Sequence, residues 1–170
     1  MIANIVFIRP NYFKHKSNYL EMLNPNNLAK QSSRFYLSIE TMYNGCSFFV
    51  PLRRNIDLTI GCIGYPVPSS TKPHAGLDYR KALVINDDKY INHLETCGIS
   101  SSQMNKMFIE KHMIERSFIK YVERYVKAAR KNRENIDKLF KYSTLHNFHA
   151  ELGLETVSFQ AQTKQSCCAH

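Results

Sequence analysis

The sequence predicts an α+β fold, in which a compact antiparallel sheet fills the first half of the chain and helices dominate the C-terminal half. Two patterns predict it. Apolar and polar side chains alternate on either side of the dipeptide Asn44-Gly45, which is typical of a β-hairpin. From about Ser101 onward, apolar residues recur every three or four positions, as on the buried face of a helix. The length of 170 residues suits one domain, expected over residues 1–155, with a disordered tail over 156–170.

The first elements are a strand and a short helical segment. Residues Ile2–Arg9 are apolar and predict a strand, which Pro10 and Asn11 end. A helical segment is expected between Asn11 and Leu23. The polar run Asn24–Asn27 then predicts a loop.

The central element is a hairpin that runs from Arg34 to Asn55. The alternating side chains are Phe35, Leu37, Ile39 and Thr41 on one strand and Phe48, Val50 and Leu52 on the other. Asn-Gly supplies two residues that accept positive φ, as a tight hairpin turn requires. A two-residue loop pairs Tyr43 with Cys46 and thereby sets Arg34 opposite Asn55.

Four polar side chains then crowd the open end of this hairpin: Arg34, Arg53, Arg54 and Asn55. Like charges that face each other destabilise a strand pair, so stability does not explain the cluster. Guanidinium groups and an asparagine amide suit phosphate oxygens, and Pro51 is expected to end the ladder where a ligand enters. The alternative is a solvated strand end whose arginines extend into water.

The middle of the chain predicts a loop between two strands. Residues 56–60 can continue the hairpin strand, and the Gly-, Pro- and Ser-rich residues 61–76 predict a long irregular loop, a candidate lid. Residues 77–85 predict another strand, whose alternation points Lys81 inward or toward a cleft. The alternative is that the Lys81 stem packs on the core and its ammonium reaches water. Residues 86–91 predict a turn and an edge strand.

The C-terminal half predicts two helices, the first capped by Ser101 or Ser102 and the second running from about Glu134 to Tyr142. The second helix is expected to bury Ile136, Leu139 and Phe140. The first is expected to bury Met107, Met113, Ile114, Phe118, Tyr121, Val122, Tyr125 and Val126. The opposite face of the helical region carries Lys111, Arg116, Lys120, Arg124, Lys127, Arg130, Lys131 and Arg133. This basic face suits a nucleic-acid backbone.

The composition favours a polyanionic partner. The chain has 23 Lys and Arg against 14 Asp and Glu, a net charge of +9, so nucleic acid is the first candidate. No apolar run approaches the roughly 18–20 residues of a spanning helix, so no membrane partner is expected. The five cysteines show no CxxC spacing, which argues against a zinc site or a disulfide framework and favours a reducing cytoplasm. No metal or cofactor is expected. GxGxxG, Walker A, HExxH and Gly-x-Ser-x-Gly motifs are also missing.

Four stretches in order resemble a known family: the opening strand into Arg9-Pro-Asn-Tyr12, residues 34–52, the run Arg53-Arg54-Asn55, and Gly76-Leu-Asp-Tyr-Arg-Lys-Ala-Leu-Val-Ile85 ahead of the helices. Together they span most of residues 1–150. This order resembles the endoribonuclease toxins of bacterial type III toxin–antitoxin and phage-abortive systems, the ToxN/AbiQ superfamily, with its TenpN branch nearest. The resemblance implies a partly barrel-like sheet related to the MazF/PemK toxins. It also implies metal-independent RNA cleavage in phage defence by abortive infection.

The same resemblance implies partners and site residues. The antitoxin would be a small structured RNA, cut by the toxin from a repetitive precursor and bound back as an inhibitor in an RNA-bridged assembly, and messenger RNA would be the substrate. Arg34 matches a basic residue of the RNA-cleaving groove, and Tyr12 matches a groove tyrosine. This chain departs from the ToxN branch at Arg53-Arg54, where that branch has Thr-Ser after Pro-Leu, so a role for those hydroxyls does not carry over.

Metal-free RNA cleavage needs a base for the ribose 2′-OH, an acid for the leaving oxygen and cations for the phosphorane, and it leaves a 2′,3′-cyclic phosphate. The cations expected here are Arg34, Arg53 and Arg54, with Asn55 beside them. His74 is the first candidate for acid or base, and Lys81 is the second. The expected RNA-binding residues are Tyr12, Arg54, Lys72, Arg116, Lys120, Arg124, Lys127 and Arg130. The alternative is that His74 is a loop histidine without a catalytic role.

Two other functions fit the composition. The first is a non-catalytic RNA-binding protein that uses the same cluster for phosphate alone. The second is an enzyme acting on free nucleotides. The second is disfavoured, because a small ligand does not need an extended basic helix.

Overall fold

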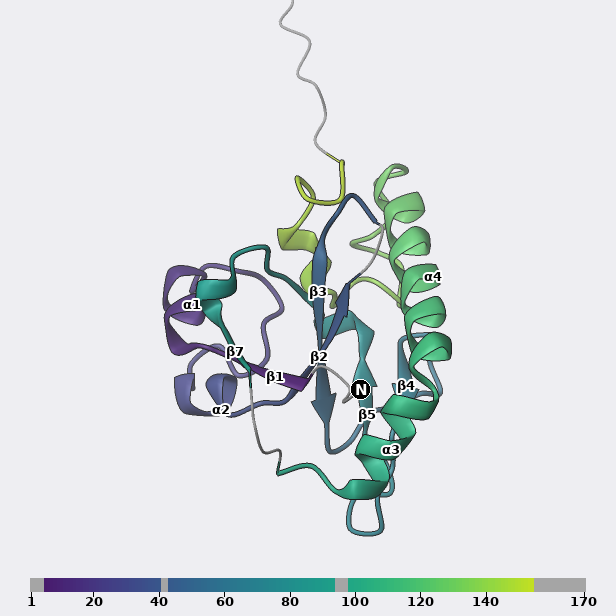
Figure 1. The fold of residues 1–170 in the computed structure, drawn as a ribbon. Helices are drawn as coiled ribbons and strands as arrows, with labels where there is room; N and C mark the ends of the chain where they lie inside the picture. The colour runs from purple at the N-terminus through teal and green to yellow at the C-terminus, as the bar shows by residue number, and fades with distance from the viewer. Residues whose placement is uncertain (1–4, 41–42, 94–97, 155–170) are drawn as a thin grey trace, which may run out of the picture.

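The computed structural model describes residues 5–40, 43–93 and 98–154, and it confirms an α+β fold built on an antiparallel sheet (Figure 1). The seven strands are β1 (Ile5–Ile8), β2 (Tyr36–Glu40), β3 (Ser47–Arg53), β4 (Gly64–Pro66), β5 (Gly76–Asp78), β6 (Leu83–Val84) and β7 (Ile91–His93). Their order is β4-β5-β3-β2-β1-β7, and β6 pairs with β3 beside β5. Among the described residues the path ends at β4 and at β7. The sheet is therefore open, and the barrel-like MazF/PemK form is not confirmed.

Helices lie on two sides of this sheet. They are α1 (Pro10–His15), α2 (Leu28–Ser32), α3 (Ser101–Ile109) and α4 (Lys111–Ala129), with 3-10 turns η1 (Tyr79–Lys81), η2 (Asp88–Tyr90) and η3 (Thr144–Asn147). In Figure 1, α1 and α2 lie near β1 and β7, whereas α3 and α4 run past β4 and β5. Within the described ranges, no helix combines the length and apolar character needed to cross a membrane. The expected tail over 156–170 lies outside these ranges.

The first expected helix is divided at Glu110 into α3 and α4, which together bury the expected stripe with one exception. The Phe118 ring packs against the rings of Phe48 in β3 and Tyr79 in η1, with centroid-to-centroid distances of 5.1 and 5.3 Å. Met113, in the first turn of α4, was expected inside but is 59% exposed. The cap of α3 is Ser100, one residue before the expected position.

The second expected helix, from Glu134 to Tyr142, is wrong, because a closed C-terminal cap ends α4. Asn132 has a φ of 52°, and the amides of Asn132 and Arg133 donate to the carbonyl oxygens of Ala129 and Ala128. This left-handed cap satisfies the last carbonyls of the helix and turns the chain away. Successive turns follow, in which Phe140 is buried but Ile136 is 72% exposed.

The central hairpin forms, but its register differs by two residues from the expected one. The pairs are Tyr36 with Pro51, Leu37 with Val50 and Glu40 with Ser47. The turn itself is correct, since Asn44 and Gly45 have φ of 51° and 67°. A shift of two keeps every side chain on its expected face, so the core pattern survives. The predicted inward position of Thr41 falls outside the described residues.

The register decides what meets at the open end of the hairpin. The Leu52 amide donates to the Phe35 carbonyl oxygen at 2.9 Å, so β3 continues past Pro51, which does not end the ladder. One step further, Arg34 lies across from Arg53 instead of Asn55. The two cations of greatest interest are thus set closer together than the sequence predicted.

Residues 56–85 differ most from the sequence prediction. Residues 56–60 are not a strand, and the expected lid contains β4, which pairs with β5 in a hairpin whose tip is closed by reciprocal Ser69 and Lys72 backbone bonds of 3.1 Å. The expected strand over 77–85 breaks at η1, because the Asp78 side chain accepts the Arg80 amide and starts a 3-10 turn. The break removes the alternation that pointed Lys81 inward.

Gly76 holds β4, β5 and β3 together, and Gly76→Ala is expected to destabilise the protein. Gly76 pairs with Arg53 of β3, and a Cβ there would lie 2.6 Å from both the Tyr65 carbonyl oxygen and Ile56 Cγ2. Overpacking of this kind costs about 1–3 kcal/mol. Chemical denaturation measures the loss. Gly45→Asn is the matched control, because nothing lies within 4 Å of that Cβ and Asn accepts positive φ.

A histidine pair beneath the end of α4 is expected to make stability depend on pH. The Tyr125 hydroxyl lies 2.9 Å from His146 Nδ1 and 2.9 Å from His149 Nε2. Burial lowers the pKa of His149 below its usual 6.5; Glu134 opposes this and His146 adds to it. The unfolded chain therefore binds the proton first, so stability is complete above pH 6.5 and falls as the pH drops below it. Melting temperatures between pH 7.5 and 5.5 should fall less in His149→Gln than in the wild type, and His15→Gln should match the wild type.

Candidate active site

A cleft of about 620 Å³ opens at the end of the β2–β3 hairpin that lies away from its Asn-Gly turn. Five of the predicted residues line it: Arg34, Arg53, Arg54, Asn55 and Lys72. Lys30 adds a further cation from α2. The floor is apolar and includes Phe35, Leu52 and Ile99. The cleft thus combines cationic side chains with an apolar surface against which a nucleotide base or another flat ring can pack.

Arg34 enters the cleft between α2 and β2 and carries an unsatisfied donor. Its Nη2 donates to Asn24 Oδ1 at 2.7 Å, but its Nε is buried and has no hydrogen-bond partner. Burial lowers the pKa of Arg34, with Arg53 acting in the same direction and Tyr36 and Asp78 opposing. An unpaired buried donor costs about 1–3 kcal/mol, and more when it is charged. An anion that accepts from Nε would remove that cost.

Arg53, in contrast, is held by a buried carboxylate. Its Nη1 donates to Asp78 Oδ2 at 2.6 Å, and the Asp78 side chain is 0% exposed. Arg80 binds the same carboxylate from the other side, with Nε 3.1 Å from Oδ1. Asp78 therefore fixes the Arg53 guanidinium at the cleft, where 31% of the side chain stays exposed. Asp78 was not among the predicted site residues, although an aspartate two residues before Arg80, within a predicted strand, is a signal of such an ion pair in the sequence.

The charge of the cleft is strongly positive. Lys30, Arg34, Arg53, Arg54 and Lys72 line it, and no carboxylate is among the lining residues. Asp78 does not line the cleft, and its carboxylate is shared between Arg53 and Arg80. Such a surplus of guanidinium and ammonium groups favours phosphate.

His74 does not line this cleft. Its side chain is exposed and borders a neighbouring hollow of about 460 Å³ together with Asp57. Ala75 lines both hollows, so the two are adjacent. The backbone explains the separation: the His74 carbonyl oxygen accepts the Ile56 amide, which directs this segment along the side of the sheet.

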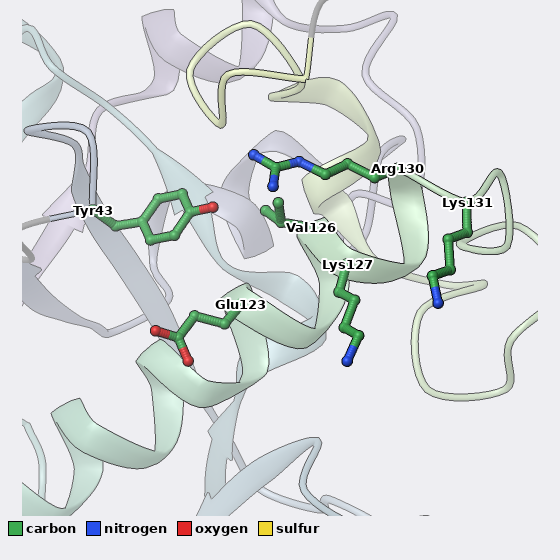
Figure 2. A pocket seen from close by; sticks show the side chains of 6 residues that line it. All are labelled: Tyr43, Glu123, Val126, Lys127, Arg130 and Lys131. Atoms are coloured by element: carbon green, nitrogen blue, oxygen red, sulfur yellow. The ribbon is translucent and has the colours of Figure 1, made fainter.

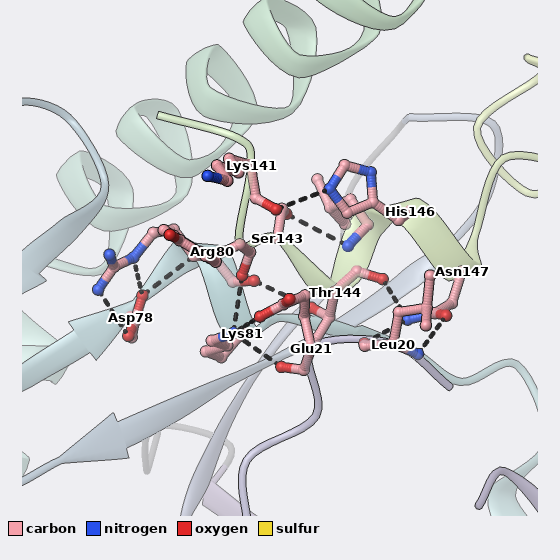
Figure 3. A network of polar contacts seen from close by, with 12 residues as sticks. Leu20, Glu21, Asp78, Arg80, Lys81, Lys141, Ser143, Thr144, His146 and Asn147 are labelled. Atoms are coloured by element: carbon pink, nitrogen blue, oxygen red, sulfur yellow. Dashed lines mark hydrogen bonds and ion pairs between the residues drawn. The ribbon is translucent and has the colours of Figure 1, made fainter. Parts of the chain in front are cut away.

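Lys81 also lies elsewhere, in a network that ties three parts of the chain together (Figure 3). Its ammonium donates to the carbonyl oxygens of Glu21 and Tyr142, each at 2.7 Å, and contacts the Glu21 carboxylate at 3.3 Å. Burial lowers the pKa of Lys81, and Glu21 opposes this. Three partners match the three protons of an ammonium, so the geometry is that of a structural anchor.

Tyr12 belongs to the core. Its ring is 2% exposed and packs edge-on against Phe13 and Tyr90, 5.5 Å away in each case. Its hydroxyl is buried without a partner, and burial raises the pKa of the phenol. Tyr12 is not among the residues that line the cleft, and the RNA-binding role that the resemblance implies for it stays a prediction.

The basic residues of α4 form a second surface, separate from the cleft. Arg116, Lys120, Arg124 and Lys127 are exposed along the helix, and Arg130 follows at its cap. None of them lines the cleft. The cleft and the α4 surface are therefore two separate cationic regions of the protein.

The fold and the cleft define an α+β protein with an open antiparallel sheet and a cleft lined by cationic side chains at one sheet end. No protein-family model matches the chain, and no curated protein sequence matches it. Among solved structures, the fold is similar to that of a protein from a bacterial type III toxin–antitoxin system, characterised by selective toxin inhibition by a non-coding RNA pseudoknot. The TM-score is 0.60 at 11% identity, over 89% of this chain and 98% of that one. The resemblance to type III toxins is thus confirmed for the fold; the TenpN branch is not.

Proposed function

We propose that the protein is the toxin of a type III toxin–antitoxin system and an endoribonuclease whose active site is the cleft at the open end of the β2–β3 hairpin. The similar fold of a type III system supports the class. The observation that carries the site is the buried, unpartnered Nε of Arg34 beside Arg53. A donor left unpaired in a cationic cleft is explained by a ligand that brings an anionic acceptor.

The proposed reaction is attack of a ribose 2′-OH on the adjacent phosphorus. The O2′–P bond forms as the 2′-OH proton passes to solvent water, and the P–O5′ bond breaks as the leaving 5′ oxygen gains a proton. The products carry a 2′,3′-cyclic phosphate and a 5′-OH. Arg34 and Arg53 bind the non-bridging oxygens, whose charge grows in the transition state. Arg54, Asn55 and Lys72 bind flanking phosphates, and the base next to the scissile bond lies over Phe35 and Leu52.

Proton transfer is proposed for His74, which borders the neighbouring hollow. A substrate strand that passes over Ala75 would reach both hollows. Histidine exchanges protons near neutral pH, which suits the protonation of the leaving 5′ oxygen. Lys81, whose ammonium is fully engaged elsewhere, is given no step.

The antitoxin proposed for this toxin is a small structured RNA, cut from a repetitive precursor and bound along the α4 surface and the cleft in an RNA-bridged assembly. Messenger RNA is the proposed substrate, and abortive phage defence the proposed role in the cytoplasm. The exposed cations of α4 support backbone tracking over several phosphates. Tandem short repeats and a terminator upstream of the gene would be the matching genetic signature.

The test is cleavage of RNA by purified protein in EDTA, followed by end-group analysis. We expect fragments with cyclic phosphate and 5′-OH ends at undiminished rate, because the proposed chemistry uses no metal. Cleavage that requires a divalent cation would overturn this mechanism.

The second candidate function, RNA binding without catalysis, rests on the same cationic cleft. It predicts tight binding and intact RNA under all conditions. Growth is the readout in cells: the nuclease stops it and fragments messenger RNA, whereas a binding protein leaves messenger RNA whole.

A further inference from the structure

A third hollow, of about 380 Å³, lies at the C-terminal end of α4 and faces the turn of the β2–β3 hairpin (Figure 2). Six residues line it: Tyr43, Glu123, Val126, Lys127, Arg130 and Lys131. It is distinct from the cleft, with which it shares no lining residue. From Arg34 to Glu40 the hairpin strand rises about 3.3 Å per residue, so roughly 20 Å separates the two regions.

The sequence builds this hollow from one helix face and one aromatic ring. Counted from Glu123, Val126 and Lys127 follow at three and four positions on one side of α4, and Arg130 and Lys131 come directly after the helix ends at Ala129. Tyr43, just before the Asn44-Gly45 turn, closes the hollow from the sheet side. In Figure 2 the Tyr43 ring and the Arg130 guanidinium reach toward each other above Val126, and Glu123 lies one turn earlier on the helix. Val126 is buried and forms an apolar floor.

The charges in the hollow are not paired with one another. In the described part of the chain, no ion pair involves Lys127, Arg130 or Lys131, and none joins Glu123 to Lys127 although their spacing allows it. Cations near a helix C-terminus complement its dipole, which accounts for the basic residues alone. It accounts neither for the carboxylate among them nor for the aromatic wall and apolar floor.

We propose that this hollow binds one unpaired guanine nucleotide of an RNA strand. The base lies against Tyr43 and Val126, its edge donates to Glu123, and the adjoining phosphates contact Lys127 and Arg130. Aromatic stacking and recognition of base edges are the usual means by which proteins read single-stranded RNA. The inference rests on the proposed function only in taking RNA as the ligand.

Guanine is favoured because of the two oxygens of Glu123. Guanine presents two adjacent donors, N1–H and the N2 amino group, which match a carboxylate in a bidentate way. Adenine and cytosine present an amino group next to a ring nitrogen acceptor, and uracil presents one N–H between two carbonyls. In each of those three bases an acceptor would face the carboxylate.

The test uses 2′-O-methyl RNA heptamers, which cannot be cleaved by 2′-OH attack. One contains a single central guanosine in uridines, one has inosine in its place, and one is all uridine. By fluorescence anisotropy we expect the wild type to bind the guanosine heptamer about tenfold more tightly than the other two, because inosine lacks the N2 donor. Glu123→Gln should remove this preference, and Tyr43→Leu should weaken binding of the guanosine heptamer to that of all uridine.

Matched variants separate this site from general affinity and from catalysis. Lys120→Gln with Arg124→Gln, also on α4 but outside the hollow, should weaken all three heptamers equally. Arg34→Ala should slow cleavage of ordinary RNA by at least on the order of a hundredfold yet keep the guanosine preference, so the proposed function and this inference can fail separately. Cleavage of unmethylated RNAs with and without the guanosine shows whether the nucleotide belongs to the substrate or to an inhibitory RNA. Equal affinity of the wild type for all three heptamers, or a preference that survives Glu123→Gln, would overturn the proposal, and would leave the hollow to a partner protein.

Discussion

Arg34→Ala is expected to lower the single-turnover rate of RNA cleavage by at least on the order of a hundredfold and to leave the melting temperature unchanged or slightly raised. The rate falls because one cation of the transition state is lost. Stability does not fall, because the Arg34 guanidinium has a buried unpaired Nε and forms no ion pair in the described part of the chain. Its removal also relieves repulsion from Arg53. Affinity for long RNA should change little, since many other cations remain.

Arg53→Ala is the matched comparison, because it removes the same charge from the same cleft. The rate should fall by a similar factor, but here the melting temperature should fall as well, since Asp78 would lose one of its two guanidinium partners. Differential scanning fluorimetry beside single-turnover kinetics separates the two effects. Full activity in both variants would mean that Arg34 and Arg53 have no catalytic role and only extend into water at the end of the strands.

Asp78→Asn is expected to cause the largest loss of stability, about 3–5 kcal/mol. Asp78 is buried and binds Arg53 and Arg80, so neutralising it leaves two guanidinium groups without a counter-charge. The amide also presents donors toward one of the two arginines. Urea denaturation measures the change, and Asp88→Asn, at an exposed turn, is the control that should match the wild type.

Activity gives a second readout for Asp78, because it positions Arg53. At a temperature where Asp78→Asn is still folded, the cleavage rate should fall while RNA affinity holds. A variant as stable as the wild type would mean that the ion pairs of Asp78 are balanced by its desolvation, contrary to this account.

The sequence could predict the cleft because its parts are close in the chain. Asn44-Gly45 marks the turn, and period-two alternation marks the two strands, so Arg34 and Arg53 had to meet at the open end. The predicted register was wrong by two residues, since a turn dipeptide does not fix how many residues lie between the turn and the first strand pair. The buried stripe of α4 was predictable because it is a local pattern within one helix.

The misplaced residues depend on contacts far apart in sequence. Lys81 binds Glu21 and Tyr142, each about 60 residues away, and no local sequence pattern predicts partners at that distance. Tyr12 packs in the core against Tyr90, which lies even further along the chain. The end of α4 is different, because the sequence itself marks it. Asn132 is a residue type that accepts the left-handed conformation of a C-terminal cap, although the helical spacing beyond it predicts a second helix.

The central claim is that the cleft between Arg34 and Arg53 holds the scissile phosphate. The most direct measurement is a crystal structure of the protein with an RNA whose 2′-OH at the cleavage position is replaced by hydrogen, so that the strand binds but cannot react. The account predicts a phosphate oxygen within hydrogen-bond distance of Arg34 Nε, with Arg53 on the same phosphate. An RNA that follows α4 and leaves the cleft without a phosphate would contradict it.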